Sequence, residues 1–184
     1  MKRFFSEYSY SCVRMFVTQC AISIYGFAMT LVAAALGEGN EWMEYVSSGF
    51  SVLFYLVLIY SLPWNHGAKD RVSADYGKIK YNALTGLYIG LIANIPNLLL
   101  ALLITVGQLA GFTGFAQICI AIDMWLQGMY MGASTIKIAG MTLNSYWWAY
   151  FLFTIPALVT STLAYIAGFN NFRVFKFPER RKKY

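Results

Sequence analysis

The chain has 184 residues, of which 59% are hydrophobic, 18% aromatic and 12% charged. A typical soluble domain carries about 25% charged residues, and a water-soluble surface needs roughly 25–35%. The composition therefore excludes an ordinary soluble enzyme, a disordered chain and a small disulfide scaffold. It indicates a protein with several membrane-spanning segments.

Long runs without a charged residue define the predicted spans. About 20 apolar residues cross a hydrocarbon layer ~30 Å thick as a helix, and such runs fill most of the chain between Met15 and Phe172. Segments such as Leu98–Ile104 do not alternate between apolar and polar residues, which argues against a transmembrane β-barrel. We predict an all-α, polytopic transmembrane helical bundle, one membrane domain over residues 1–184, with spans at about 12–36, 45–62, 83–109 and 147–169. A cleaved secretory signal is the alternative for the first span, but its charge-free run exceeds the roughly 7–15 residues of a signal core.

The Lys and Arg residues predict which side each end faces. Bases are present before the first span, in the loop 63–80 and six times in the tail 170–184, whereas the first loop has three Glu and no base. Because bases near span ends stay on the cytoplasmic side, both termini are predicted to be cytoplasmic in a multi-pass protein of the cell membrane. The number of full crossings is then even. The same bases predict affinity for anionic lipid at that face, which accounts for the net charge of +6 without nucleic acid.

Residues 112–136 form a fifth apolar segment, and the even number of crossings predicts that this segment does not cross the membrane. A fifth crossing would place the basic tail outside, so we predict that the segment lies in the outer interface or dips into the membrane and returns. The single base Lys137 argues the other way. Asp123 is the only acidic residue in this stretch, with Gln127 one turn further on. An intramembrane carboxylate is a candidate for binding an ion or carrying a proton; the alternative is that Asp123 anchors the segment at a wet interface.

Two predicted spans contain a central proline, Pro96 in the third and Pro156 in the fourth. Proline removes a backbone donor and frees carbonyls that need other partners, and broken helices line binding cavities in transporters. Asn94 and Asn97 beside Pro96, and Thr154 beside Pro156, are therefore candidate ligand-binding residues. The alternative is a kink whose polar side chains bond to a neighbouring helix.

Two further groups are candidates for protein contacts. Gly86 and Gly90 form a small-x-x-x-small pair that permits close helix packing, within the bundle or in an oligomer. The predicted cytoplasmic loop 63–80 holds a polar cluster that is either a solvated turn or a docking site for a partner, and it contains His66, Lys69, Asp70 and Arg71. His66 and Asp70 are also candidates for a pH-sensitive pair.

No familiar catalytic or cofactor motif is present. The three cysteines have no zinc-type or haem-type spacing, and the chain lacks a phosphate-binding loop, a metalloprotease motif and a nucleophile elbow. We therefore expect no enzyme activity, no cofactor and no metal site.

The runs Gly67-Ala68-Lys69-Asp70-Arg71 and Thr85–Ala93, followed by Pro96, resemble small integral membrane proteins of Firmicutes. These share a Gly-x-Lys-Asp-x loop that opens a Gly-Leu-x-Ile-Gly-Leu-x-Ala span with a proline. The chain departs from their pattern at residues 72–74, which are Val-Ser-Ala where that family usually has Asn. The resemblance covers about a third of the chain; it implies a bacterial multi-pass protein and carries over no activity.

Three functions remain open. The first is a small transport-related component, which at four spans would need a partner membrane subunit or further copies of itself. The second is a non-catalytic accessory subunit that packs through Gly86 and Gly90 and docks through residues 66–71. The third is the substrate-binding subunit of an energy-coupling-factor importer, against which the span count argues because such subunits normally have six.

Overall fold

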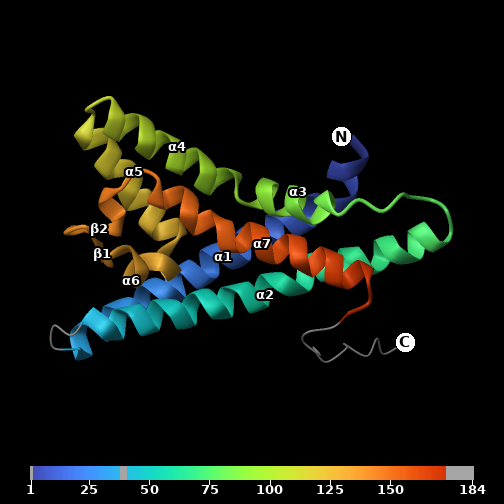
Figure 1. Cartoon of the computed structure of the whole chain (residues 1–184), viewed down its shortest axis with the longest axis horizontal. Coiled ribbons are helices and arrows are strands. Elements are labelled where there is room, and N and C mark those ends of the chain that lie inside the picture. Colours follow the sequence, from blue (N-terminus) through green and yellow to red (C-terminus); the bar gives the residue numbers. More distant parts are fainter. Residues whose placement is uncertain (1, 38–40, 173–184) are drawn as a thin grey trace.

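Three long helices lie side by side and form the body of the molecule. The computed structural model describes residues 2–37 and 41–172. Helices α1 (Lys2–Leu36) and α2 (Glu41–Asp75) run antiparallel, and α7 (Ala149–Phe169) packs along α2 (Figure 1). At 1.5 Å per residue, α1 and α2 are each about 50 Å long and α7 about 30 Å, so each is long enough to cross a bilayer.

A bent pair of helices follows α2. Helices α3 (Leu84–Ala93) and α4 (Ile95–Leu109) are inclined at 64° to each other at a break on Asn94, and together they are long and apolar enough to be one broken span. Pro96 lies in the first turn of α4, where its missing N–H is no loss because the first turn has no intrahelical acceptor. Pro156 lies inside α7, which continues through it.

The remaining elements gather at one end of the bundle (Figure 1). They are α5 (Thr113–Leu126), η1 (Gly128–Tyr130), α6 (Met131–Ser134), β1 (Lys137–Ile138), β2 (Met141–Thr142) and η2 (Leu143–Ser145). The two strands pair antiparallel around Ala139 and Gly140, whose φ angles of 52° and 85° are those of a type I′ turn. We call this the Lys137 end.

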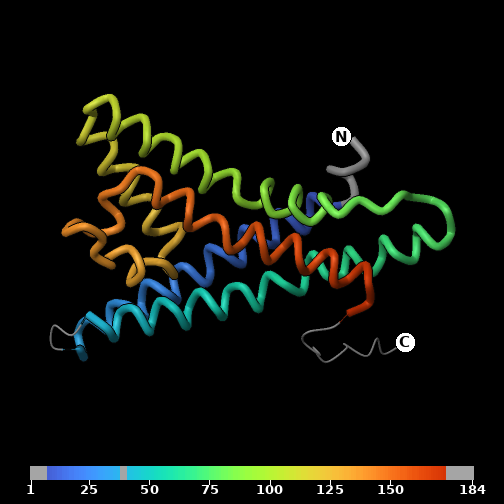
Figure 2. The backbone as a smooth tube through the Cα atoms, viewed as in Figure 1, coloured from blue at the N-terminus to red at the C-terminus, as the bar shows by residue number. Residues whose placement is uncertain are grey.

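At the opposite end of the bundle, hydrogen bonds join three helices. Asp70 of α2 accepts a hydrogen bond from the Tyr8 hydroxyl of α1 at 2.6 Å and one from the Tyr165 hydroxyl of α7 at 2.7 Å. The start of α1 and the end of α7 therefore lie together, at what we call the Asp70 end. Figure 2 shows α1, α2, the α3–α4 pair and α7 running between the two ends.

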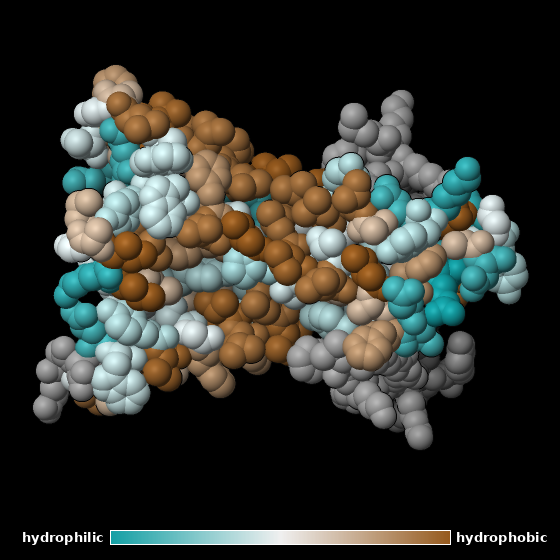
Figure 3. Space-filling view, viewed as in Figure 1, coloured by the Kyte–Doolittle hydropathy of each residue, from teal (hydrophilic) through white to brown (hydrophobic). Residues whose placement is uncertain are grey.

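The surface is that of a membrane protein. On the face shown in Figure 3, apolar residues cover the middle of the molecule and hydrophilic residues gather towards its two ends. Leu99, Leu102 and Leu163 are more than half exposed, whereas Ser48, Asn97 and Ser161 inside the bundle are fully buried. Polar groups inside and aliphatic groups outside reverse the pattern of a soluble domain, so the chain is a helical membrane protein.

The prediction of a loop at residues 63–80 is wrong for most of that range, because α2 continues as a helix to Asp75. The cause is tertiary. A Cβ on Gly67 would lie 2.1 Å from the Tyr165 carbonyl oxygen, and one on Gly168 would lie 2.0 Å from that of Trp64. The two glycines let α2 and α7 cross in backbone contact, and this crossing holds the segment after Pro63 helical.

Gly86 and Gly90 pack against α7 within the bundle. A Cβ on Gly86 would lie 2.7 Å from the Ser161 carbonyl oxygen, and one on Gly90 would lie 2.2 Å from the Ser161 hydroxyl. Of the two uses that the sequence leaves open, packing within the chain is the one observed, against α7. This face is therefore not free for a partner subunit.

Replacing Asp70 with Asn is expected to lower the unfolding free energy by about 1–3 kcal/mol, because two hydrogen bonds to a charged acceptor become bonds to a neutral one. Tyr8 and Tyr165 are both buried and lose their carboxylate partner together. Thermal unfolding of the purified protein measures the effect. Asp75→Asn is the control, since Asp75 lies at the exposed end of the same helix; equal melting temperatures for the two variants would contradict the prediction.

Candidate functional site

Helix α5 ends in the middle of the bundle. Its last carbonyl, on Leu126, accepts a hydrogen bond from the Gln19 amide at 3.3 Å and one from the Ser23 hydroxyl. Both donors lie near the centre of the apolar part of α1, Tyr8–Leu36. Both side chains are buried, and a helix end that is shielded from water needs protein donors. At 14 residues, α5 is about 21 Å long and too short to cross.

The chain then returns to the end from which α5 came. The Ser48 hydroxyl of α2 donates to the Met129 carbonyl at 2.8 Å and accepts from the Ala133 N–H at 3.2 Å. Lys137 next contacts Glu41, at the start of α2, with 2.7 Å between Nζ and Oε1; this hydrogen bond raises the pKa of Lys137. The segment therefore enters and leaves at the Lys137 end, which is the geometry of a re-entrant element.

Asp123 lies one turn before the inner end of α5. Its side chain is 2% exposed, and its Oδ1 accepts a hydrogen bond from the Gln127 amide at 2.9 Å. Among the described residues it has no basic partner. Protein therefore covers Asp123 in place of the water contact that an interfacial position was expected to give it. The buried Gln19–Ser23 face of α1 binds the end of α5 and keeps the carboxylate inside the bundle.

A small cavity adjoins this carboxylate. It has a volume of about 20 Å³, and its lining includes Asp123, Gln127, Tyr130, Asn144 and Tyr150. The Tyr130 hydroxyl is buried and has no hydrogen-bond partner among the described residues. A space of this size holds about one water molecule or ion, with a carboxylate, an amide and a phenol around it.

A wider polar opening lies beside the small cavity, towards the Lys137 end. It has a volume of about 310 Å³ and is lined by Gln108, Gln117, Asn144 and Ser145, among others. Asn144 lines both spaces. Along α5, Gln117 and Ile120 line the opening and Asp123 and Gln127 line the cavity, so the two spaces follow each other along this helix.

The local electrostatics favour a cation. The C-terminal end of a helix carries a partial negative charge, and in transporters half-helix ends at mid-depth coordinate Na⁺ or protons. Here the end of α5 and the Asp123 carboxylate add to each other. The described residues contain no group of three or more His, Cys, Asp or Glu that would hold a multivalent metal ion.

The predicted residues Asn94, Asn97 and Thr154 form no common site with Asp123. The Asn94 amide donates to the Gly90 carbonyl at 2.9 Å, and the Asn97 amide donates to Asn94 Oδ1 at 2.9 Å. Thr154 donates to the Phe151 carbonyl of its own helix. These bonds stay within the α3–α4 pair and within α7, so they are not the hydrogen bonds to a neighbouring helix that the sequence left open as the alternative.

The cluster at residues 66–71 is partly built into the bundle. His66 hydrogen-bonds to Ser11 of α1 and meets the Tyr8 ring edge-on at a centroid distance of 5.0 Å. Arg71 donates to the Phe169 carbonyl at 3.4 Å, and Lys69 is exposed. Only part of this cluster faces outward for docking.

Four residues of the candidate site escape the sequence analysis: Gln19, Tyr130, Asn144 and Tyr150. Buried tyrosines cannot be told from interfacial ones by composition, since Tyr is enriched at membrane interfaces. Gln19 alone gives a signal, as a strong hydrogen-bonding side chain inside a predicted span, where such groups face protein rather than lipid.

Comparisons with protein-family profiles, curated proteins and solved structures gave no match to this chain. The case for a function therefore rests on the geometry around Asp123.

Proposed function

We propose that the chain is a small transport-related component of a cell-membrane complex, in which Asp123 binds a proton or a monovalent cation that enters from the Lys137 end. The observation that carries the proposal is the burial of this carboxylate, without a basic partner among the described residues, at the inner end of a re-entrant half-helix. A lone charged carboxylate is costly in a low-dielectric interior, so it takes up a proton or another cation.

The proposed orientation follows from the basic residues, which favour the Asp70 end as the cytoplasmic one. The polar opening at Gln117 and Asn144 then faces outward, and the carboxylate is reached from outside. With four crossings the chain is small for a complete transporter, so we propose that it acts with a partner membrane subunit or with further copies of itself, and without an enzyme activity of its own.

Thermal unfolding of the purified protein tests the cation site. A ligand that binds only the folded state stabilises it by about 2.7 kcal/mol at a hundred times its Kd. If the ligand is Na⁺, wild-type stability rises when NaCl replaces choline chloride. If it is a proton, stability rises as the pH falls, because the folded state then binds more protons than the unfolded one.

Asp123→Asn is expected to remove the dependence of stability on NaCl, or on pH if the ligand is a proton, since Asn is nearly isosteric with Asp but carries no charge. Asp75→Asn, at the other end of the molecule, is the control and should respond as the wild type does. An identical response of wild type and Asp123→Asn to both NaCl and pH would overturn the site. If the proposed assembly consists of further copies of the chain, transport is testable in proteoliposomes. A pH-sensitive dye inside should report proton flux, or a Na⁺-sensitive dye Na⁺ flux, with the wild type and none with Asp123→Asn.

A further inference from the structure

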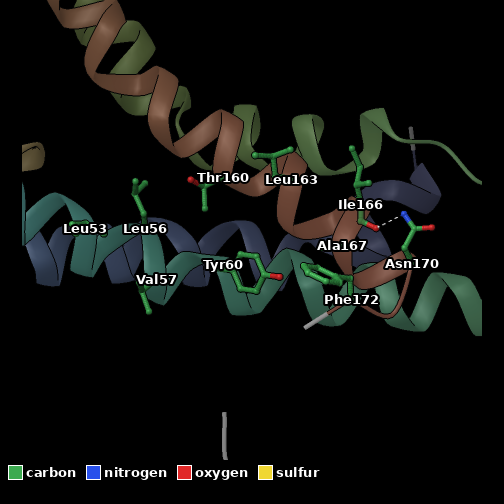
Figure 4. A pocket seen from close by; sticks show the side chains of 10 residues that line it. All are labelled: Leu53, Leu56, Val57, Tyr60, Thr160, Leu163, Ile166, Ala167, Asn170 and Phe172. Atoms are coloured by element: carbon green, nitrogen blue, oxygen red, sulfur yellow. Dashed lines mark hydrogen bonds between the residues drawn. The ribbon is translucent and has the colours of Figure 1, made fainter. Parts of the chain in front are cut away.

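A long apolar groove runs along the outer face of the α2–α7 pair (Figure 4). Its volume is about 610 Å³, and its walls include Leu53, Leu56, Tyr60 and Leu163. The groove is separate from the Asp123 site, with which it shares no lining residue. Its walls come from α2, from α7 and from the residues directly after α7.

The length of the groove matches one leaflet. Its α7 wall extends from Thr160 to Asn170, which is roughly 15 Å of helix and about half of a ~30 Å hydrocarbon core. It begins near the middle of the molecule and ends at the Asp70 end. An occupant that enters from the bilayer would therefore lie parallel to the lipid tails of that leaflet.

The walls suit an acyl chain better than a partner helix. Transmembrane helices meet through small residues that let their backbones approach, whereas this groove is lined mainly by large aliphatic and aromatic side chains. The glycines of the same two helices, Gly67 and Gly168, already meet the opposite backbone within the chain.

Positive charge lies at the end of the groove, at the level where a headgroup would be. Arg71 is exposed, and it is tied to α7 through the Phe169 carbonyl, one residue before the groove residue Asn170. In the sequence, Arg173 directly follows the groove residue Phe172, and five further bases come after it. Arg pairs with phosphate through a planar, multidentate guanidinium.

We propose that this groove binds one acyl chain of an anionic glycerophospholipid, with the lipid phosphate at Arg71. The groove supplies the apolar contact area and Arg71 supplies the preference for a negative headgroup. The proposal does not depend on the function of Asp123.

Lipid retention by the purified full chain tests this. The protein is exchanged into mixed micelles that contain equal amounts of phosphatidylglycerol and phosphatidylcholine, and the bound lipids are counted by native mass spectrometry. Wild type is expected to retain phosphatidylglycerol preferentially. Arg71→Ala should reduce that preference about fivefold, which is the effect of one base near a membrane surface. Lys69→Ala is the matched control, because Lys69 is exposed on the same helix but about 200° around it from Gly67, which faces α7.

A variant that fills the groove tests the contribution of the acyl chain separately from that of the headgroup. Ala167→Phe, which places a ring in the groove, should lower retention of both lipids, whereas Leu102→Phe on the exposed face of α4 should lower neither. A photo-crosslinker at Leu163 should yield a lipid adduct. Equal retention of the two lipids by wild type, an Arg71→Ala variant that behaves like Lys69→Ala, or a crosslink to a second copy of the chain or to another protein would each overturn the proposal.

Discussion

Gly67→Ala is expected to lower the melting temperature of the purified protein by about 2–12 °C, since overpacking costs roughly 1–3 kcal/mol and 1 kcal/mol shifts a chain of this size by about 2–4 °C. The added Cβ would lie 2.1 Å from the Tyr165 carbonyl oxygen and 2.8 Å from the Phe169 backbone nitrogen. Both atoms belong to the backbone of α7. The clash is therefore relieved only by moving one helix away from the other.

The sign of this effect separates packing from helix propensity. Alanine is favoured over glycine inside a helix by about 1 kcal/mol, so the substitution would stabilise α2 if nothing lay opposite. Gly49→Ala on the same helix is the matched control, because its Cβ would meet no atom within 4 Å. Gly49→Ala should leave the melting temperature unchanged or raise it. If Gly67→Ala does the same, the close crossing of α2 and α7 is refuted.

The double variant Gly67→Ala/Gly168→Ala adds a test of geometry. Both glycines lie at one crossing, so a helix shift that accommodates the first methyl group also makes room for the second. The two effects on stability are then expected to be less than additive, as is usual for residues that share partners.

The course of the chain through the membrane follows from simple features of the sequence. Charge-free runs locate the three long apolar helices and the bent α3–α4 pair, and the starts of α3 and α7 lie within two residues of the predicted boundaries. The break in the third pass coincides with the predicted Asn94–Pro96 site. These features are local: apolar length and proline act on the segment that contains them.

Features that depend on distant residues are the ones that the sequence analysis misses. Pro63 and the polar residues after it are typical of a loop, but the contact of Gly67 with α7 keeps them helical. The β1–β2 hairpin turns on Ala139 and Gly140, and Ala-Gly lacks the Asn-Gly or Asp-Gly signal of such turns.

The candidate site is half predictable for the same reason. Asp123 and Gln127 are recognisable because they are polar, one turn apart and inside an apolar segment. Their depth in the bundle depends on the hydrogen bonds of Gln19 and Ser23 to Leu126, which lies more than a hundred residues further along the chain. No local sequence pattern indicates this contact. Charge parity suggests a segment that turns back but leaves open how deep it goes.

Gly132→Ala is expected to displace the re-entrant segment from its position between α1 and α2. The new Cβ would lie 2.1 Å from the Glu44 carbonyl oxygen, 2.7 Å from its carbon and 3.0 Å from the Ser48 Cβ. Ser48 holds this segment through both Met129 and Ala133, so a shift at Gly132 breaks two hydrogen bonds as well. Losing them adds roughly 0.5–1.5 kcal/mol each to the cost of overpacking.

Cysteine labelling reports this displacement directly. Cys119 on α5 is 4% exposed and should react slowly with a maleimide in the wild type, with the labelled site identified by peptide mass spectrometry. In Gly132→Ala, the segment after α5 loses its Ser48 bonds, and the inner end of α5 keeps only the bonds of Leu126 to Gln19 and Ser23. Cys119 labelling should then rise severalfold, while that of Cys12, buried between α1 and α3, should not. Gly114→Ala is the control on α5 itself, because its Cβ would meet no atom within 4 Å. Since Asp123 occupies the same helix one turn further in, a mobile α5 should also lose the cation dependence of stability. Faster labelling of Cys119 with that dependence intact would separate the site from the re-entrant geometry that we hold responsible for it.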